Sequence, residues 1–169
     1  MCIRDRNSQL REDEHESGRT MVVSGTGEAT VQSVTLHDRD GALVEHVNVG
    51  DEVELRLSVR VDTDIPRLVL GYMIKDRLGQ QIFGTNTHHT EQALHDARAG
   101  DVVEYRARFR MNLGPGSYSV STALVSTETH LVNNYEWRDL ALVFTVSNFD
   151  KPYFIGSAWM PPHIELVRA

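Results

Sequence analysis

The chain has 169 residues, a length that suits one domain built around one hydrophobic core. Its 24 acidic and 17 basic residues give a formal net charge of −7, and no run of five basic residues occurs, which argues against nucleic-acid binding through phosphates. Cys2 is the only cysteine, so neither an intramolecular disulfide nor a cysteine-based metal site is expected, and a reducing compartment fits.

The N-terminal residues 1–22 are expected to be a disordered linker or an expression remnant. The stretch from Arg4 to Arg19 is almost entirely polar and cannot bury enough apolar surface to offset chain entropy. It lacks the apolar centre of a signal peptide, and no later run of about 18 apolar residues could cross a membrane. Because it leads directly into a domain, we expect the natural protein to continue N-terminally.

From Ala29 onward, apolar residues recur with a period of two, which predicts strands. The clearest are Val53–Val61 and Val102–Met111, which we expect to be antiparallel neighbours with charged outer faces that pair across the ladder. Further strands are predicted at Thr30–Leu36, Leu43–Val47, Leu68–Lys75, Gln81–Gly84, Ser117–Val125 and Leu140–Val146.

Turn signals separate these strands. Asp38–Gly41 and Asp76–Gly79 place Asp early and Gly late, a pattern typical of hairpins. Gln92–Ala99 is the one segment that could form a short helix. Leu113–Tyr118 carries a Tyr directly after a glycine turn, which predicts a tyrosine corner; the alternative is an ordinary core tyrosine. Residues 23–148 are therefore predicted to form an all-β, immunoglobulin-like antiparallel β-sandwich, with a jelly-roll-like variant as the alternative.

The two sheets are expected to differ in the chemistry of their outer faces. Arg56, Arg60, Arg106, Arg108 and Arg110 form a stripe that we interpret as a solvated ladder that discourages edge aggregation, although an anion site is the alternative. The side chains on the outer face of the other sheet are small, uncharged and partly apolar. A ligand, a partner subunit or the chain's own tail is expected to cover it.

Catalytic and metal sites find little support. His88 and His89 are adjacent on an extended segment and point to opposite sides, so zinc is not expected. No nucleophile motif or paired carboxylates indicate a hydrolase, and Ser24–Gly27 lacks the following helix of a phosphate loop. We expect no enzyme activity, no metal and no cofactor.

Polar and aromatic residues gather instead near the ends of predicted strands. Sugars present apolar C–H faces and many hydroxyls, and this mixture of side chains suits them. The alternative is that Tyr135 and Trp137 pack in the core and that Asn133–Asn134 is a turn. The candidate carbohydrate-binding residues are Asn86, Thr87, His88, Ser119, Ser121, Glu128, His130, Asn134, Tyr135 and Trp137.

A series of short motifs in order resembles a known family. The motifs are Gly25–Ala29, Val49–Val53, Gly71–Asp76 with Gly79, Phe83–Thr87 and Leu113–Tyr118. Together they resemble the C-terminal carbohydrate-binding domain of Wzt-type ATP-binding subunits in O-antigen polysaccharide ABC transporters, over about Gly25 to Ser147.

The resemblance implies a non-catalytic immunoglobulin-like module that binds the modified non-reducing end of an O-antigen-type glycan and presents it to the exporter. It implies a homodimer, nucleotide-binding and membrane subunits as partners, and a cytoplasmic location at the inner face of the bacterial inner membrane. The tail, residues 149–169, is expected to supply a strand that is exchanged between subunits or folded back. No nucleotide-binding loop occurs in the sequence, so ATPase activity would belong to the parent subunit. The alternative function is a structural or adhesin-like interaction module without glycan binding.

Overall fold

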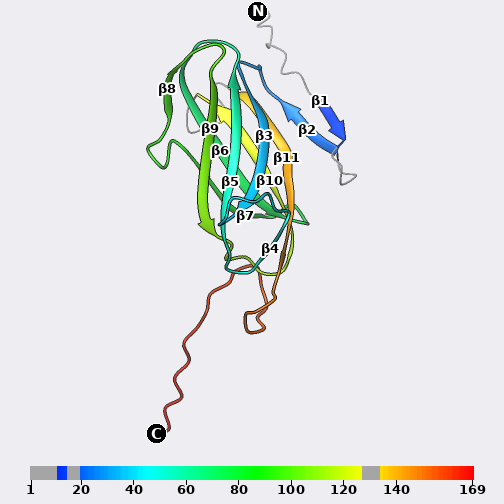
Figure 1. Ribbon diagram of the computed structural model, residues 1–169, viewed down its shortest axis with the longest axis vertical. Coiled ribbons are helices and arrows are strands. Elements are labelled where there is room, and N and C mark those ends of the chain that lie inside the picture. The colour runs from blue at the N-terminus through cyan, green and yellow to red at the C-terminus, as the bar shows by residue number, and fades with distance from the viewer. Residues whose placement is uncertain (1–10, 15–19, 127–133) are drawn as a thin grey trace, which may run out of the picture.

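Two β-sheets packed face to face make up the protein, in a computed structural model that describes residues 11–14, 20–126 and 134–169 (Figure 1). The larger sheet has the order β1 (Arg11–Glu14), β2 (Thr20–Ser24), β11 (Asn134–Ser147), β10 (Gly116–Val125), β6 (Ile65–Asp76) and β7 (Gln81–Asn86), with β4 (His46–Asn48) parallel beside β11 and β8 (Leu94–Ala97) beside β6. The smaller sheet has the order β3 (Ala29–Asp38), β5 (Glu52–Val61) and β9 (Val102–Arg110).

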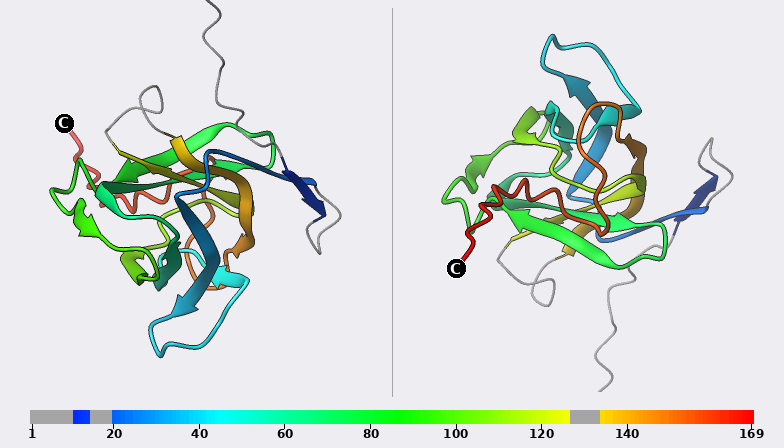
Figure 2. Two further views of the ribbon diagram at one scale, coloured as in Figure 1. Left: turned by 90° about the horizontal axis from the view of Figure 1, so that it is seen from above. Right: turned by 90° about the horizontal axis from the view of Figure 1, so that it is seen from below.

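The core lies between these sheets and follows from the alternation of apolar residues. On β5, Val53, Leu55, Leu57, Val59 and Val61 are all buried, because alternate side chains of a strand share one face. They pack with apolar residues of β6, β10 and β11 from the opposite layer. Viewed along the strands, the two layers lie face to face and the β1–β2 hairpin extends beyond them (Figure 2). The predicted all-β sandwich is confirmed.

The charged stripe lies on the outer face of the smaller sheet, as predicted. β5 and β9 are antiparallel neighbours, with Glu54 opposite Arg108 and Arg56 opposite Arg106. Glu54 is 8% exposed and receives hydrogen bonds of 2.5 Å from both Arg56 and Arg108. The predicted cross-strand pairing is therefore confirmed at Glu54.

The predicted turn chemistry is also present. Gly41 and Gly79 have φ values of 84° and 81°, a region that favours glycine. In each turn the leading aspartate, Asp38 or Asp76, accepts hydrogen bonds from backbone N–H groups two and four residues later. The two turns therefore close by the same mechanism.

The tyrosine corner is confirmed by its hydrogen bond. The hydroxyl of buried Tyr118 donates to the carbonyl oxygen of Gly114 at 2.7 Å. The Tyr118 ring stacks on Phe144 of β11, with a centroid separation of 5.7 Å. The corner thus anchors the start of β10 to the core.

Three segments differ from the predictions. Gln92–Ala99 contains β8 instead of a helix, because its backbone pairs with the start of β6, from Ile65 to Leu68. Leu43–Val47 makes only a single bridge at Leu43 before the short strand β4. Within residues 1–22, Arg11–Glu14 pairs with β2. The ladder between β1 and β2 is formed by backbone N–H and C=O groups, which do not depend on side-chain type, so the polar composition of this segment did not reveal it.

The C-terminal tail is only partly packed on its own chain. Phe154 and Trp159 contact each other with a centroid separation of 4.8 Å and pack against the core. The backbone N–H of Trp159 donates to the carbonyl oxygen of Asn112 at 2.9 Å. The final residues extend away from the sandwich (Figure 1). Several large apolar side chains of the tail are exposed, namely those of Phe149, Tyr153, Ile155, Met160, Ile164, Leu166 and Val167.

In the part of the chain that the structure describes, no helix is long and apolar enough to span a membrane.

Candidate functional site

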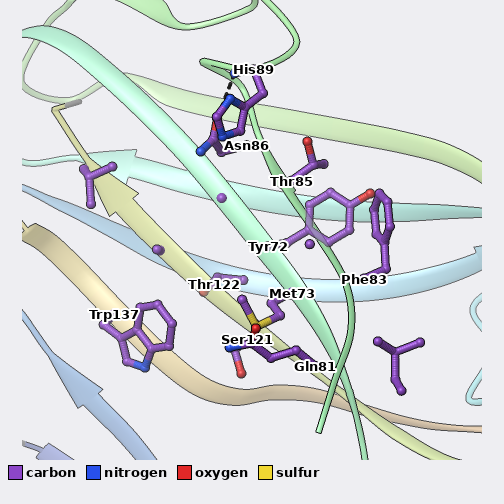
Figure 3. Close-up of a pocket in the computed structure, with 15 residues that line it drawn as sticks. Tyr72, Met73, Gln81, Phe83, Thr85, Asn86, His89, Ser121, Thr122 and Trp137 are labelled. Carbon is purple, nitrogen blue, oxygen red and sulfur yellow. Dashed lines mark hydrogen bonds between the residues drawn. The ribbon is translucent and has the colours of Figure 1, made fainter. Parts of the chain in front are cut away.

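A pocket of about 410 Å³ lies on the larger sheet, over β6, β7, β10 and β11. Strand register explains its shape. Trp137, Ala123, Gly71 and Asn86 are cross-strand neighbours in one row that runs through β11, β10, β6 and β7. With neighbouring strands about 4.8 Å apart, this row spans about 14 Å. The Trp137 indole stands at one end of the row and the Asn86 amide at the other (Figure 3). Ala123 and Gly71, which have little or no side chain, form the floor between them.

Two glycines within strands keep this floor open. Neither Gly71 nor Gly84 has a positive φ, so the backbone conformation does not require glycine there. A Cβ at Gly71 would meet its nearest atoms, Asn86 Cβ and the Thr85 carbonyl oxygen, at 3.5 and 3.6 Å, which are ordinary contacts. Glycine inside a strand usually marks a bulge or a close approach to a ligand or another backbone. The missing side chain leaves space in the pocket.

The polar groups at the rim are held by local hydrogen bonds. The side-chain oxygen of Asn86 accepts a 2.8 Å hydrogen bond from the backbone N–H of His89, which leaves the Asn86 amide N–H groups for a ligand (Figure 3). Gln81 and Thr85 add further donors and acceptors to the lining. The site can therefore both stack a ring and hydrogen-bond hydroxyls.

A small charged network supports the Trp137 side of the pocket. Asp139 accepts hydrogen bonds from the Ser121 hydroxyl and from Lys75 Nζ, the latter at 3.0 Å. Burial would raise the pKa of Asp139, but these two hydrogen bonds and the Lys75 charge lower it overall. The Lys75 ammonium also lies 5.8 Å from the centroid of the Trp137 ring. The outer face that we expected to be uncharged therefore carries one ion pair at this end.

The structure brings together only some of the predicted site residues. Asn86, Ser121 and Trp137 line the pocket. Ser119 is buried on the same strand, beside Lys75 and Val143, and is not part of the lining. Glu128 and His130 fall outside the described residues.

Four other predicted site residues lie elsewhere. The Thr87 hydroxyl accepts a hydrogen bond from Leu70 N–H, and His88 Nδ1 lies 2.7 Å from Arg67 Nη2. Asn134 is the first residue of β11 and lies opposite Val125, the last residue of β10. Tyr135 is buried in the core, so the alternative interpretation holds for that residue.

Sequence reasoning missed several residues of the pocket. Gly71, Met73, Gln81 and Phe83 all line it. The signal that could have identified Gly71 is its position in the middle of an otherwise strongly apolar strand, where glycine weakens the strand unless space is needed.

No group of three or more His, Cys, Asp or Glu side chains able to hold a metal occurs among residues 11–14, 20–126 and 134–169.

The fold was compared with solved structures, and the sequence with curated proteins and family models. A solved structure described as the C-terminal domain of Wzt matches with a TM-score of 0.76 at 17% identity, covering 87% of this chain and 89% of that one. An alkylpurine DNA glycosylase AlkC from Pseudomonas fluorescens matches with a TM-score of only 0.42 at 12% identity, over 72% of this chain and 31% of that one. No significant match was found among curated protein sequences. The model of the Wzt C-terminal domain family matches residues 21–160, and the chain therefore belongs to the Wzt C-terminal domain family.

Proposed function

We propose that this domain binds the modified non-reducing end of an O-antigen-type polysaccharide in the pocket between Trp137 and Asn86. Membership of the Wzt C-terminal domain family supports the broader statement that it is a non-catalytic carbohydrate-binding module of an O-antigen ABC transporter. The observation that carries the finer proposal is the row of Trp137, Ala123, Gly71 and Asn86. An indole beside a flat floor can stack on the C–H face of a sugar ring, while the amide reaches its hydroxyls.

The remaining parts of the proposal follow from the same role. The parent protein would carry the ATPase, and this domain would act in the cytoplasm at the inner face of the bacterial inner membrane, together with nucleotide-binding and membrane subunits. The exposed apolar side chains of the tail, including Ile155 and Met160, support a homodimer in which the tail packs on the second subunit.

Titration calorimetry with the polysaccharide from the same source, with and without its terminal modification, tests glycan binding. We expect binding of the modified form and loss of at least tenfold in affinity for Trp137→Ala. Trp159→Phe is the matched control, because Trp159 packs near Gly50 and outside the pocket. Absence of binding to both polysaccharide forms would refute the proposal.

Gly71→Val separates binding from folding. A Cβ added at position 71 would make only ordinary contacts, so the strand should accept valine there. Replacing a glycine within a strand by a β-branched residue should not lower stability. The added methyl groups would occupy the pocket floor. We expect an unchanged or raised free energy of unfolding together with weakened glycan binding. Full binding by this variant would show that the glycan site does not lie over Gly71.

A structural or adhesin-like interaction module is the second candidate function. The same exposed tail residues favour it, since apolar side chains in water indicate a protein contact. A dimer that buries the whole pocket face and leaves no open groove would support this second function.

A further inference from the structure

The pocket between Trp137 and Asn86 has no formally charged lining. None of its 15 lining residues is Asp, Glu, Lys or Arg. The groups that can titrate there are His89, which is exposed, and the Tyr72 hydroxyl, whose pKa is raised by burial. An anionic ligand would therefore find no fixed cation within the pocket near neutral pH.

The cations nearest to the pocket along the strands already have partners. Lys75 is paired with Asp139 at 3.0 Å, and Arg138 with Glu136 at 3.3 Å. Arg67 donates to the Ser126 carbonyl oxygen at 2.8 Å. In sequence, residues 127–133 contain one Glu and one His but no Lys or Arg. An anion in the pocket would therefore have to share a cation that already has a partner.

The balance between lost hydration and gained electrostatic contacts therefore favours a neutral ligand. A carboxylate or phosphate placed against Trp137, Met73 and Val125 would lose its hydration without gaining an ion pair, which is costly. The chain's net charge of −7 would also repel a polyanion on approach. A neutral sugar ring loses little by comparison, because its apolar face meets the indole and its hydroxyls meet Asn86 and Gln81.

We infer that the pocket selects a terminal sugar residue that carries no formal charge, and discriminates against residues that bear a carboxylate or phosphate. This inference rests on the proposed glycan-binding function and specifies the class of its ligand.

Matched sugar pairs provide the test. Methyl glycosides of glucose, galactose and mannose are each compared with the corresponding uronic acid, which differs only by a carboxylate in place of the CH2OH group. Binding is followed at pH 8 by the NMR shift of the Trp137 indole N–H. Trp159 supplies the second indole signal as an internal control, and Trp159→Phe assigns the two.

We expect at least one neutral sugar to shift the Trp137 signal and its uronic acid to bind at least tenfold more weakly. Equal or tighter binding of the uronic acid overturns the inference while leaving glycan binding intact. If no member of any pair shifts the Trp137 signal, the inference fails, whereas the proposed function is judged by the polysaccharide titration.

A variant that adds a positive charge to the pocket tests the same preference from the side of the protein. Gln81 lies at the exposed rim of the pocket, opposite Lys75 in the β6–β7 ladder. Gln81→Lys should raise uronic acid binding relative to the neutral partner by several-fold, and Gln81→Met, which adds no charge, should not. A preference that is the same in both variants would contradict electrostatic selection.

Discussion

Glu136 Oε1, on β11, accepts a 3.0 Å hydrogen bond from the backbone N–H of Val31, on β3, and so links the two sheets. The carboxyl is 3% exposed, and a bulge between Val31 and Ser33 interrupts the β3 ladder beside it. Burial raises the pKa of Glu136, while the Val31 N–H and Arg138 oppose that shift. Glu136 therefore provides a buried hydrogen-bond acceptor inside an otherwise apolar core.

Removing this carboxyl should destabilise the domain. Glu136→Ala leaves the Val31 N–H and the Arg138 guanidinium without their buried partner and should cost about 3 kcal/mol. Glu136→Gln keeps an acceptor for Val31 and should cost about 1 kcal/mol. Urea unfolding measures both. The exposed Glu104, paired with Arg106, is the control, and Glu104→Ala should cost less than about 1 kcal/mol. Similar losses at both sites would contradict a linking role for Glu136.

Glu54 should make folding stability depend on pH in the acid range. Hydrogen bonds from Arg108 and Arg56 lower the pKa of Glu54 to about 2 from an ordinary value of 4.5. The unfolded chain therefore binds a proton more readily than the folded one between these values, so stability falls as pH drops from 4.5 towards 2. Glu54→Gln should flatten this part of the stability–pH profile. An identical acid limb in the variant would exclude Glu54 as its source.

The arginine stripe should affect stability unevenly and glycan binding not at all. Arg106 pairs with the exposed Glu104, so Arg106→Gln should change stability only slightly. Arg108 pairs with the nearly buried Glu54, so Arg108→Gln should cost more than Arg106→Gln. Thermal unfolding and glycan titration of both variants decide this. A large loss of glycan affinity in either one would place the binding site on the smaller sheet.

The tail should hold two subunits together. Burying large apolar side chains contributes about 1.5–3 kcal/mol each, and the exposed Phe149, Tyr153, Ile155 and Met160 gain none of this within their own chain. We expect a dimer for the whole chain and a monomer or an aggregate after truncation at Ser147, measured by light scattering. A full-length monomer at micromolar concentration would leave only the folded-back contacts of Phe154 and Trp159.

Much of the fold follows from local patterns. Alternation on β5 and β9, the Asp and Gly positions of two turns, and the Gly–Pro–Gly sequence before Tyr118 each act over a few residues, so they can be read directly. The binding site is harder to predict from the sequence, because it depends on how residues of different strands pair. That Trp137 lies opposite Ala123, and that Gly71 lies between Ala123 and Asn86, follows from strand order. Composition placed Asn86, Ser121 and Trp137 among the candidates but could not separate them from buried Ser119 and Tyr135.

The irregularity in β11 also escaped prediction. β11 has three residues between Arg138 and Leu142, whereas β10 has only Ser121 between Val120 and Thr122, and Leu140 takes a φ of 50°. The continuous apolar alternation of Leu140–Val146 suggested an unbroken strand instead. The bulge places Asp139 where it meets Ser121 and Lys75, which explains the ion pair on the outer face.

Because this bulge adds two residues, it preserves which side chains face the core. Glu136 points inward and Trp137 outward before it, and Phe144 and Val146 point inward after it. Changing the length of β11 here by one residue would reverse that assignment, carrying the indole into the core and the Glu136 carboxylate into the pocket. Relatives of this chain should therefore differ in length at this point by even numbers of residues, and an odd insertion or deletion should accompany loss of the binding face.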